Sequence, residues 1–262
     1  MKQQPTVISS VKKWLEGSGF PLEMQTAAAF RKEGFEVRPS SQYIDAETGK
    51  GREIDVLTSL RDPDFLGIIE IYFAIECKSS PKPWVLLTSE DAASGYNRIF
   101  AFGVLSKKAK HAFVSRIHEF VETLPWFRKE GAIGYSFRQA FSKESDPAYS
   151  AALSAAKACE HLARPTDRRH VAPLMLAFPV IVVDAPLIQC SLREDGHLDL
   201  QEVDLGEFLF FAHLPHLFGT CIRVVRASRL ASFAMEAKRN AEQFRTALKP
   251  EEEKIKESWA KH

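Results

Sequence analysis

Two neighbouring stretches, GREIDVL at residues 51–57 and GIIEIYFAIECKSSPKPWV at residues 67–85, decide how this chain folds. Both have the composition of buried β-strands, and successive side chains of a strand point to opposite faces of a sheet. One face of the second stretch is apolar and carries Ile69, Ile71, Phe73, Ile75 and Cys77. The other face ends in a carboxylate beside an ammonium and carries Glu70, Tyr72, Ala74, Glu76 and Lys78. This ending is either a solvated strand tip or a chemically active edge of the sheet.

The composition limits the class of protein. The chain has 262 residues, of which 45% are hydrophobic and 26% charged, so it can bury a large core and we interpret residues 1–262 as a single domain. Its formal net charge of +1 neither requires nor excludes a nucleic-acid partner, because positive charge can be local. The four cysteines are widely separated and form no CxxC pair, which favours free thiols in a reducing cytoplasm over structural zinc. No apolar run is long enough to span a bilayer, so we expect a soluble cytoplasmic protein.

The order of patterns predicts an α/β fold with a mixed central β-sheet flanked by helices. A helix is expected from about residue 21 to residue 34, where a glycine stops it. Strands are expected at about 36–43, 52–59 and 67–78, separated by the turn signals DAETGKG and RDPD.

The second half of the chain continues this α/β pattern. The stretch AYSAALSAAKACEHLA at 148–163 predicts a helix whose alanines allow close packing on a sheet. The stretch LMLAFPVIVVDAPLIQCSL at 174–192 predicts a further buried strand. We interpret residues from about 90 to 147 as a helical insertion, and residues from about 231 to 262 as a solvated C-terminal helix.

Three charged side chains are expected to meet at one end of this sheet. In REIDVL, strand alternation places Asp55 and Leu57 on one face and Ile54 on the other. If this strand pairs with the next through the RDPD turn, Asp55 comes beside Glu76 and Lys78. Carboxylate oxygens are ligands that Mg²⁺ and Mn²⁺ prefer, and an adjacent ammonium can stabilise charge that develops on a phosphate. The pattern therefore indicates metal-assisted chemistry on a phosphate ester.

A third carboxylate, that of Glu23, can join this group. Glu23 lies in the first turn of the expected helix, and helical spacing places it in line with Ala27 and Phe30, which should face the sheet. An inward glutamate is costly unless it meets a cation. Acidic residues are also common in the first turn because they interact favourably with the helix dipole. The sequence leaves both interpretations of Glu23 open.

These motifs resemble the PD-(D/E)XK nuclease superfamily, and within it the bacterial restriction- and defence-related nucleases that carry a glutamate on the first helix. The resemblance covers residues 21–85 and rests on Glu23, on Asp55 in REIDVL and on IECK at 75–78. Ile54 stands where the family's name has a proline, a position at which many members differ. Further along, DPAYSAALSAAKA and FPVIVVDAPL are compatible with the helix and strand that complete the family's core.

The resemblance implies a restriction-endonuclease-like fold and a metal-dependent nuclease. Asp55, Glu76 and the backbone carbonyl of Cys77 would bind Mg²⁺, or Mn²⁺ in its place, with Glu23 as an additional ligand and catalytic residue. Lys78 would be the catalytic lysine. The implied activity is hydrolysis of phosphodiester bonds in nucleic acid, with a DNA endonuclease of bacterial restriction or anti-phage defence as the expected form. A protein partner or a second copy of the chain would supply targeting or activation.

Two other classes remain open on the sequence. One is a catalytically silent subunit that keeps the nuclease fold as a scaffold or nucleic-acid clamp. The other is a Mg²⁺ enzyme acting on a small phosphorylated substrate, although the chain has no glycine-rich phosphate loop.

Basic and aromatic residues outside these motifs are further candidates for contacts with nucleic acid. The clusters SKKAKHAFVSR at 106–116 and ARPTDRRH at 163–170 suit phosphate contacts, and Trp84 and Tyr96 suit stacking on bases. The alternative is that such clusters are solvated faces.

Overall fold

The computed structural model describes residues 6–60, 66–92, 103–124, 126, 132–142, 146–164, 173–215 and 217–259. Within these ranges no helix is both long and apolar enough to cross a membrane. The helices are α1 (Val7–Glu16), α2 (Phe20–Lys32), α4 (Lys107–Val114), α5 (Ile117–Thr123), α6 (Pro147–Ala163) and α7 (Leu230–Trp259), with a 3₁₀ turn at Ala227–Arg229. The strands are β1 (Glu36–Ile44), β2 (Gly51–Ser59), β3 (Ile69–Lys78), β4 (Trp84–Ser89), β5 (Val104–Leu105), β6 (Ile133–Gln139), β7 (Leu174–Val183), β8 (Leu187–Leu192), β9 (Leu198–Val203), β10 (Leu205–Leu214) and β11 (Leu217–Arg226).

The described strands form one mixed sheet, which confirms the expected α/β class. Its order is β1-β2-β3-β7-β11-β10-β6-β4-β8-β9, and β5 pairs with β7. The strands β1, β2 and β3 form an antiparallel meander, as the turn signals predict. β3 then pairs in parallel with β7, and β7 pairs in parallel with β11.

β3 and β7 are neighbouring interior strands of the sheet and are buried on both faces. They pair along their whole length, from Ile69 opposite Leu174 to Lys78 opposite Val183. Such near-continuous apolar strands are typical of parallel pairs covered on both sides. The predicted alternation in β3 is confirmed, because its five apolar residues from Ile69 to Cys77 lie in one core cluster whereas Tyr72 and Ala74 lie in the other.

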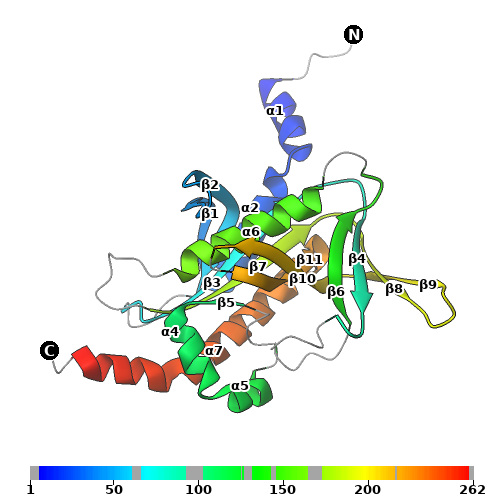
Figure 1. The fold of residues 1–262 in the computed structure, drawn as a ribbon. Helices are drawn as coiled ribbons and strands as arrows, with labels where there is room; N and C mark the ends of the chain where they lie inside the picture. Colours follow the sequence, from blue (N-terminus) through cyan, green and yellow to red (C-terminus); the bar gives the residue numbers. More distant parts are fainter. Residues whose placement is uncertain are drawn as a thin grey trace, which may run out of the picture.

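Helices cover both faces of this sheet (Figure 1). The core on one face receives Phe30 from α2, Phe113 from α4, Phe120 from α5 and Phe233 from α7. The opposite face is covered by α6, whose alanines are buried against the sheet as its sequence predicts. Small side chains let this helix approach the strands closely.

The expected helical insertion at about 90–147 is wrong for the residues described there. They contain α4 and α5 but also β5 and β6, and β6 pairs with β4 and β10 inside the main sheet. Gly134 allows this pairing, since a Cβ at that position would lie 2.8 Å from the Cβ of Phe208. The stretch 174–192 likewise forms two strands, β7 and β8, with Asp184, Ala185 and Pro186 between them.

The C-terminal helix is present as expected, but the prediction that it is solvated is wrong. One face of α7 packs into the core at helical spacing. The buried residues of this face are Phe233, Ala234, Ala237, Ala241, Phe244, Leu248 and Ile255. The many charged residues between them dominate the composition of the segment and conceal this period.

An ion-pair cluster fixes the β1–β2 turn to α6. The side chain of Asp45 is 1% exposed and its Oδ2 lies 2.9 Å from Nζ of Lys157 and 3.6 Å from Nε of Arg52. Lys157 also binds Glu47. Burial acts to raise the pKa of Asp45, but the hydrogen bonds from Lys157 and from the Glu47 N–H outweigh it and lower that pKa. Asp45 therefore stabilises the fold above its unfolded pKa, and this contribution is lost as the pH falls.

We expect Lys157→Met to destabilise the protein by roughly 3 kcal/mol at pH 7, because a buried carboxylate loses its main counter-charge. The difference from the unmodified protein should narrow below about pH 4, where Asp45 can be protonated. Urea denaturation of both proteins at pH 7 and below about pH 4 measures this difference in stability. As a control, Arg193→Met removes the exposed bridge to Asp195 and should change stability by less than about 0.5 kcal/mol. Equal effects of the two substitutions would contradict this role of Lys157.

Candidate active site

The structure brings Asp55, Glu76 and Lys78 together, as the sequence predicts. Nζ of Lys78 donates a hydrogen bond of 2.6 Å to Oε2 of Glu76 and lies 3.7 Å from Oδ2 of Asp55. The ammonium thus stands between two carboxylates at the end of β3. The chain after Lys78 is also held in place, since Asp184 accepts hydrogen bonds from the hydroxyl of Ser79 and the N–H of Ser80.

Asp55 lies where β2 and β3 separate. The register between these strands runs from Ser59 to Val56, and Asp55 is the next residue. Its Oδ2 accepts a hydrogen bond of 2.7 Å from the N–H of Cys77. A side chain therefore replaces the backbone partner that this N–H would have if the β2–β3 pairing continued. On the other side of β2, Ser40 falls opposite Asp55 in the register and has a φ of 48°, which is unusual for a residue other than glycine.

The side chains of β2 do not follow the simple alternation expected for this strand. Val56 packs in the core under α2 and α7, whereas Ile54 and Leu57 both pack in the core under α6. The prediction that Ile54 points away from the face of Leu57 is therefore wrong. The departure from regular strand geometry coincides with the candidate catalytic aspartate, and irregular backbone of this kind is common at functional sites.

The backbone of Cys77 is oriented toward the same place. In a strand, the N–H and C=O of one residue point to the same side. Because the Cys77 N–H points to Asp55, its carbonyl is directed toward β2 as well, and away from β7. This is the orientation that the predicted role of the Cys77 carbonyl requires.

Glu76 is held from both sides. It is 4% exposed; Oε2 accepts the hydrogen bond from Lys78, and Oε1 accepts one of 2.7 Å from the hydroxyl of Ser154 on α6. Burial raises the pKa of Glu76, Asp55 adds to the rise, and Lys78 and Ser154 oppose it. Ser154 in turn accepts a hydrogen bond at its carbonyl from the hydroxyl of Tyr43.

Ser154 is a site residue that the sequence did not reveal. It is one small side chain in an alanine-rich helix, and its role becomes evident from its hydrogen bond to Glu76. The feature that could have indicated it is its polarity in a stretch that otherwise packs closely on the sheet.

The charges of Lys78 and Glu23 respond to this environment. Burial acts to lower the pKa of Lys78, but Glu76 and Asp55 outweigh it and raise that pKa, so the side chain is an ammonium. The pKa of Glu23 is raised by burial and then by the charge of Asp55, while Lys78 lowers it. Glu23 therefore lies near enough to interact electrostatically with both residues, from the first turn of α2.

Cys77 contributes its backbone to the site but not a reactive thiol. Its side chain is buried on the opposite face of β3 and donates a hydrogen bond to Thr26 Oγ1. Burial raises the pKa of this thiol to about 12, so it is protonated at neutral pH and is not a nucleophile.

Of the predicted base-stacking residues, Trp84 is excluded and Tyr96 lies outside the described residues. Trp84 is 1% exposed and stacks on Phe137, with ring centroids 5.2 Å apart. Its large apolar ring is used in the core under α6 and does not reach nucleic acid.

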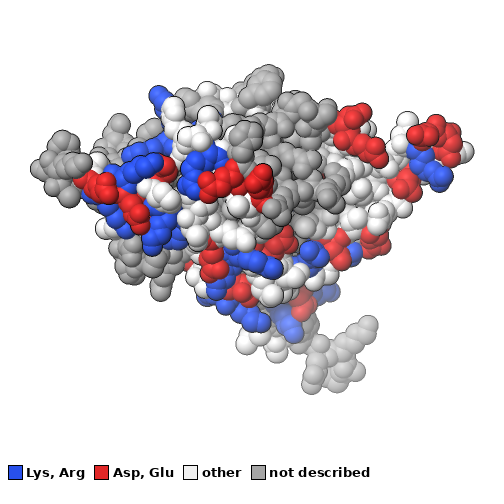
Figure 2. Space-filling view, turned by 90° about the horizontal axis from the view of Figure 1, so that it is seen from below, with Lys and Arg blue, Asp and Glu red and all other residues white. Residues whose placement is uncertain are grey.

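The basic cluster at 106–116 lies on α4, where Lys107, Lys108 and Lys110 are exposed. Figure 2 shows that basic side chains on this side of the molecule alternate with acidic ones. Lys254 of α7, for example, pairs with Glu251 at 2.8 Å. The surface seen there has mixed charge, which is typical of a solvated face. Most of the second cluster, at 163–170, lies outside the described residues.

Comparisons with known proteins identify no relative. No protein-family model matches the chain, and neither a curated protein nor a solved structure matches it. In the part of the chain that the structure describes, no group of three or more His, Cys, Asp or Glu side chains is preassembled to hold a metal ion. The interpretation of the site therefore rests on the geometry of Asp55, Glu76 and Lys78.

Replacing Lys78 by Met tests the electrostatics of the site without any ligand. Glu76 then stays buried with the Ser154 hydrogen bond but without the ammonium, so its pKa should rise further. A carboxyl group whose pKa is higher in the folded than in the unfolded chain weakens the fold as the pH rises through the folded pKa. We expect the Lys78→Met variant to lose about 2 kcal/mol relative to the unmodified protein at pH 8 and much less at pH 5.

Urea denaturation at both pH values measures this difference. Lys254→Met is a suitable control, because it removes a lysine from an exposed pair with Glu251 that lies away from the site. A loss of stability in Lys78→Met that is the same at both pH values would show that the ammonium does not compensate Glu76.

Proposed function

We propose that this protein is a metal-dependent nuclease of the PD-(D/E)XK type that hydrolyses phosphodiester bonds in nucleic acid, with DNA as the expected substrate. The observation that carries the proposal is the meeting of two carboxylates and one ammonium, from Asp55, Glu76 and Lys78, at the end of β2 and β3. Their order in the chain and their place on the strands are those of the motif to which the sequence is similar.

The order of the elements supports the same proposal. A helix, α2, precedes three antiparallel strands, and the helix α6 then leads to β7, which pairs in parallel with β3. This succession is the one expected of a restriction-endonuclease-like core. The strands β4, β6 and β8–β11 extend the sheet beyond it.

The donor set of the site fits Mg²⁺ or Mn²⁺. Asp55 and Glu76 provide hard carboxylate oxygens, and the carbonyl of Cys77 is directed to the same side. The ammonium of Lys78 lies within 4 Å of both carboxylates, so this position favours a positive charge. Glu23 adds negative charge from α2. Its raised pKa is consistent with repulsion between carboxylates that a bound cation would reduce.

Each side chain has a distinct expected role. Asp55, Glu76 and the Cys77 carbonyl would hold the metal ion, with Glu23 as an additional ligand. When bound, the ion would supply positive charge that polarises a phosphodiester and lowers the pKa of an attacking water. Lys78 is partly exposed, so its ammonium can face a substrate phosphate and neutralise the charge that develops there. Ser154 fixes the orientation of the Glu76 carboxylate through the hydrogen bond to Oε1.

The resemblance supports a proposed role in bacterial restriction or anti-phage defence, and the small overall charge supports a need for a partner. With a formal net charge of +1, the chain gains little non-specific attraction to the phosphate backbone. A protein partner or a second copy of the chain would then supply tight binding and targeting.

Cleavage assays on supercoiled plasmid and on labelled single-stranded DNA and RNA, with Mg²⁺ or Mn²⁺, test the function directly. We expect metal-dependent cutting that falls about a hundredfold or more in Asp55→Asn, Glu76→Gln and Lys78→Met. Glu70→Gln is the matched control, because Glu70 lies on the same face of β3 at its opposite end and binds Tyr72. It should retain activity.

Two results would redirect the proposal. Metal-dependent cleavage that survives all three substitutions would place the chemistry elsewhere. Nucleic-acid binding without cleavage in either metal would indicate the alternative, a catalytically silent scaffold or clamp.

Ser154→Ala should weaken metal binding without removing a ligand. Residues that orient metal ligands typically change metal affinity by about 10- to 100-fold, so we expect a Kd for Mn²⁺ at least about tenfold higher. Calorimetry with Mn²⁺ measures it, and higher Mn²⁺ should restore cleavage. Ser150→Ala, an exposed serine one turn earlier on α6, is the control. An unchanged Kd in Ser154→Ala would mean that the hydrogen bond to Glu76 does not position the carboxylate.

A further inference from the structure

Helix α1 exposes a large apolar face. Val7, Ile8, Val11 and Trp14 are 80%, 81%, 47% and 63% exposed, and none of the residues of α1 is buried. They lie on one side of the helix, and its lysines and serines lie on the other. A helix of ten residues is only marginally stable alone in water, and most helices are stabilised by packing of their apolar face. We therefore expect the apolar face of α1 to be covered by a partner.

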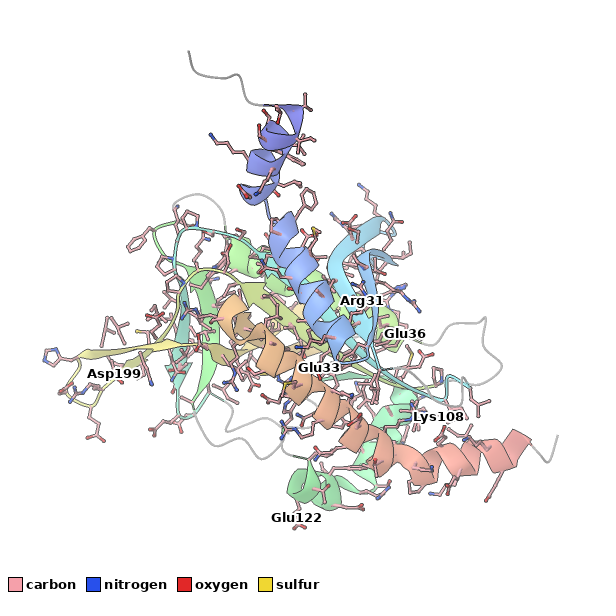
Figure 3. The ribbon with its side chains drawn as sticks, turned by 180° about the vertical axis from the view of Figure 1, so that it is seen from behind. Arg31, Glu33, Glu36, Lys108, Glu122 and Asp199 are labelled. Atoms are coloured by element: carbon pink, nitrogen blue, oxygen red, sulfur yellow. The ribbon has the colours of Figure 1, made fainter. Side chains whose placement is uncertain are left out.

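The apolar face continues onto α2. The ring of Trp14 contacts that of Phe20 with centroids 5.9 Å apart, and Phe20 and Met24 are themselves 46% and 69% exposed. Figures 1 and 3 show α1 standing out from the rest of the molecule, with α2 following it. A contiguous exposed patch of more than a few hundred Å² on a monomer usually marks an interaction surface.

The charges beside this face favour a second copy of the chain as its occupant. Lys12 and Lys13 are followed by Glu16, so both signs are present on one short helix. A helix that lies on a lipid surface is typically rich in Lys and Arg on its polar face. In an antiparallel pair of α1 helices centred on Trp14, Lys12 of one copy is level with Glu16 of the other.

The apolar residues fit the same register. Val11 of one copy is level with Gly17, the residue that ends α1 of the other copy, and Gly17 has no side chain to keep the two chains apart. The surface is thus self-complementary about a two-fold axis, which is the requirement for an isologous dimer. Six large side chains, two of them aromatic, offer apolar area of the order of the roughly 800 Å² per partner that a standard interface buries.

We propose that α1 and the start of α2 form a homodimer interface, in which α1 packs antiparallel against α1 of a second copy. The inference does not depend on the nuclease activity. Because α1 leads into the first turn of α2, which carries Glu23, the dimer would hold two candidate active sites in one particle.

Sedimentation velocity over a concentration series tests the dimer. The unmodified protein should sediment as a dimer at micromolar concentrations, and Trp14→Glu should raise the dimer Kd by at least about thirtyfold. Leu200→Glu is the matched control, because Leu200 on β9 is also 63% exposed and lies outside the proposed interface. It should leave the Kd unchanged.

Charge exchange tests the register and separates contacts between copies from those within one helix. Lys12→Glu and Glu16→Lys each place like charges at positions 12 and 16, so each variant should dimerise at least about tenfold more weakly than the unmodified protein. An equimolar mixture of the two restores opposite charges only between copies. It should form a heterodimer more tightly than either variant forms a homodimer.

Three results would overturn the proposal. The first is a protein that stays monomeric up to about 100 µM, well above the range expected for a stable dimer. The second is a dimer that Trp14→Glu leaves intact or a mixture no tighter than its components. The third is a monomer that binds vesicles of phosphatidylglycerol and phosphatidylcholine through α1, which would assign the apolar face to a lipid surface.

Discussion

The pairing of β3 with β7 is the constraint on which the rest of the structure depends. These strands run side by side from Ile69 and Leu174 to Lys78 and Val183, with helices on both faces. Their length is filled with apolar side chains, because a charge in the middle of either strand would be buried without water. On β3, the ionised groups Glu76 and Lys78 therefore stand together where the strand ends. The candidate site occupies the end of β3 for this physical reason, whatever chemistry it performs.

The charges at that end are balanced rather than simply exposed. Glu76 is nearly inaccessible and Asp55 is close to it, so each carboxylate raises the electrostatic cost of the other, and Lys78 offsets both. Replacing a buried ion pair by apolar groups is often neutral or stabilising, so such a cluster contributes little to stability as a whole. Ser40, which falls opposite Asp55 in the register, also has a backbone conformation that is unusual for a residue other than glycine. Both costs are consistent with the proposal that the site has a chemical role.

The features that could be predicted from the sequence are those carried by single strands and by the short turns that join neighbouring strands. The alternation in β3, the boundaries of the β1–β3 meander and the meeting of Asp55 with Glu76 and Lys78 follow from strand period and turn residues alone. The irregular alternation of β2 could not be predicted, because it occurs where β2 and β3 stop pairing and the side chain of Asp55 accepts the hydrogen bond of the Cys77 N–H. Ser154 was missed because its role depends on which strand residue α6 covers. The buried face of α7 and the place of β6 in the sheet were missed because charged or short segments concealed their apolar period.

The packing of α7 has a consequence for how the protein is made. Residues such as Phe233 and Phe244 share one core with Phe30, Phe73 and Phe178, so this face of the sheet is closed by residues about 200 positions after α2 in the sequence. During translation the N-terminal helix and strands leave the ribosome long before that cover does. The nascent chain must then hold an uncovered apolar sheet until residues 230–255 emerge, a state that is prone to aggregation and suited to chaperone binding. The core on this face therefore becomes complete only after residues 230–255 have been synthesised.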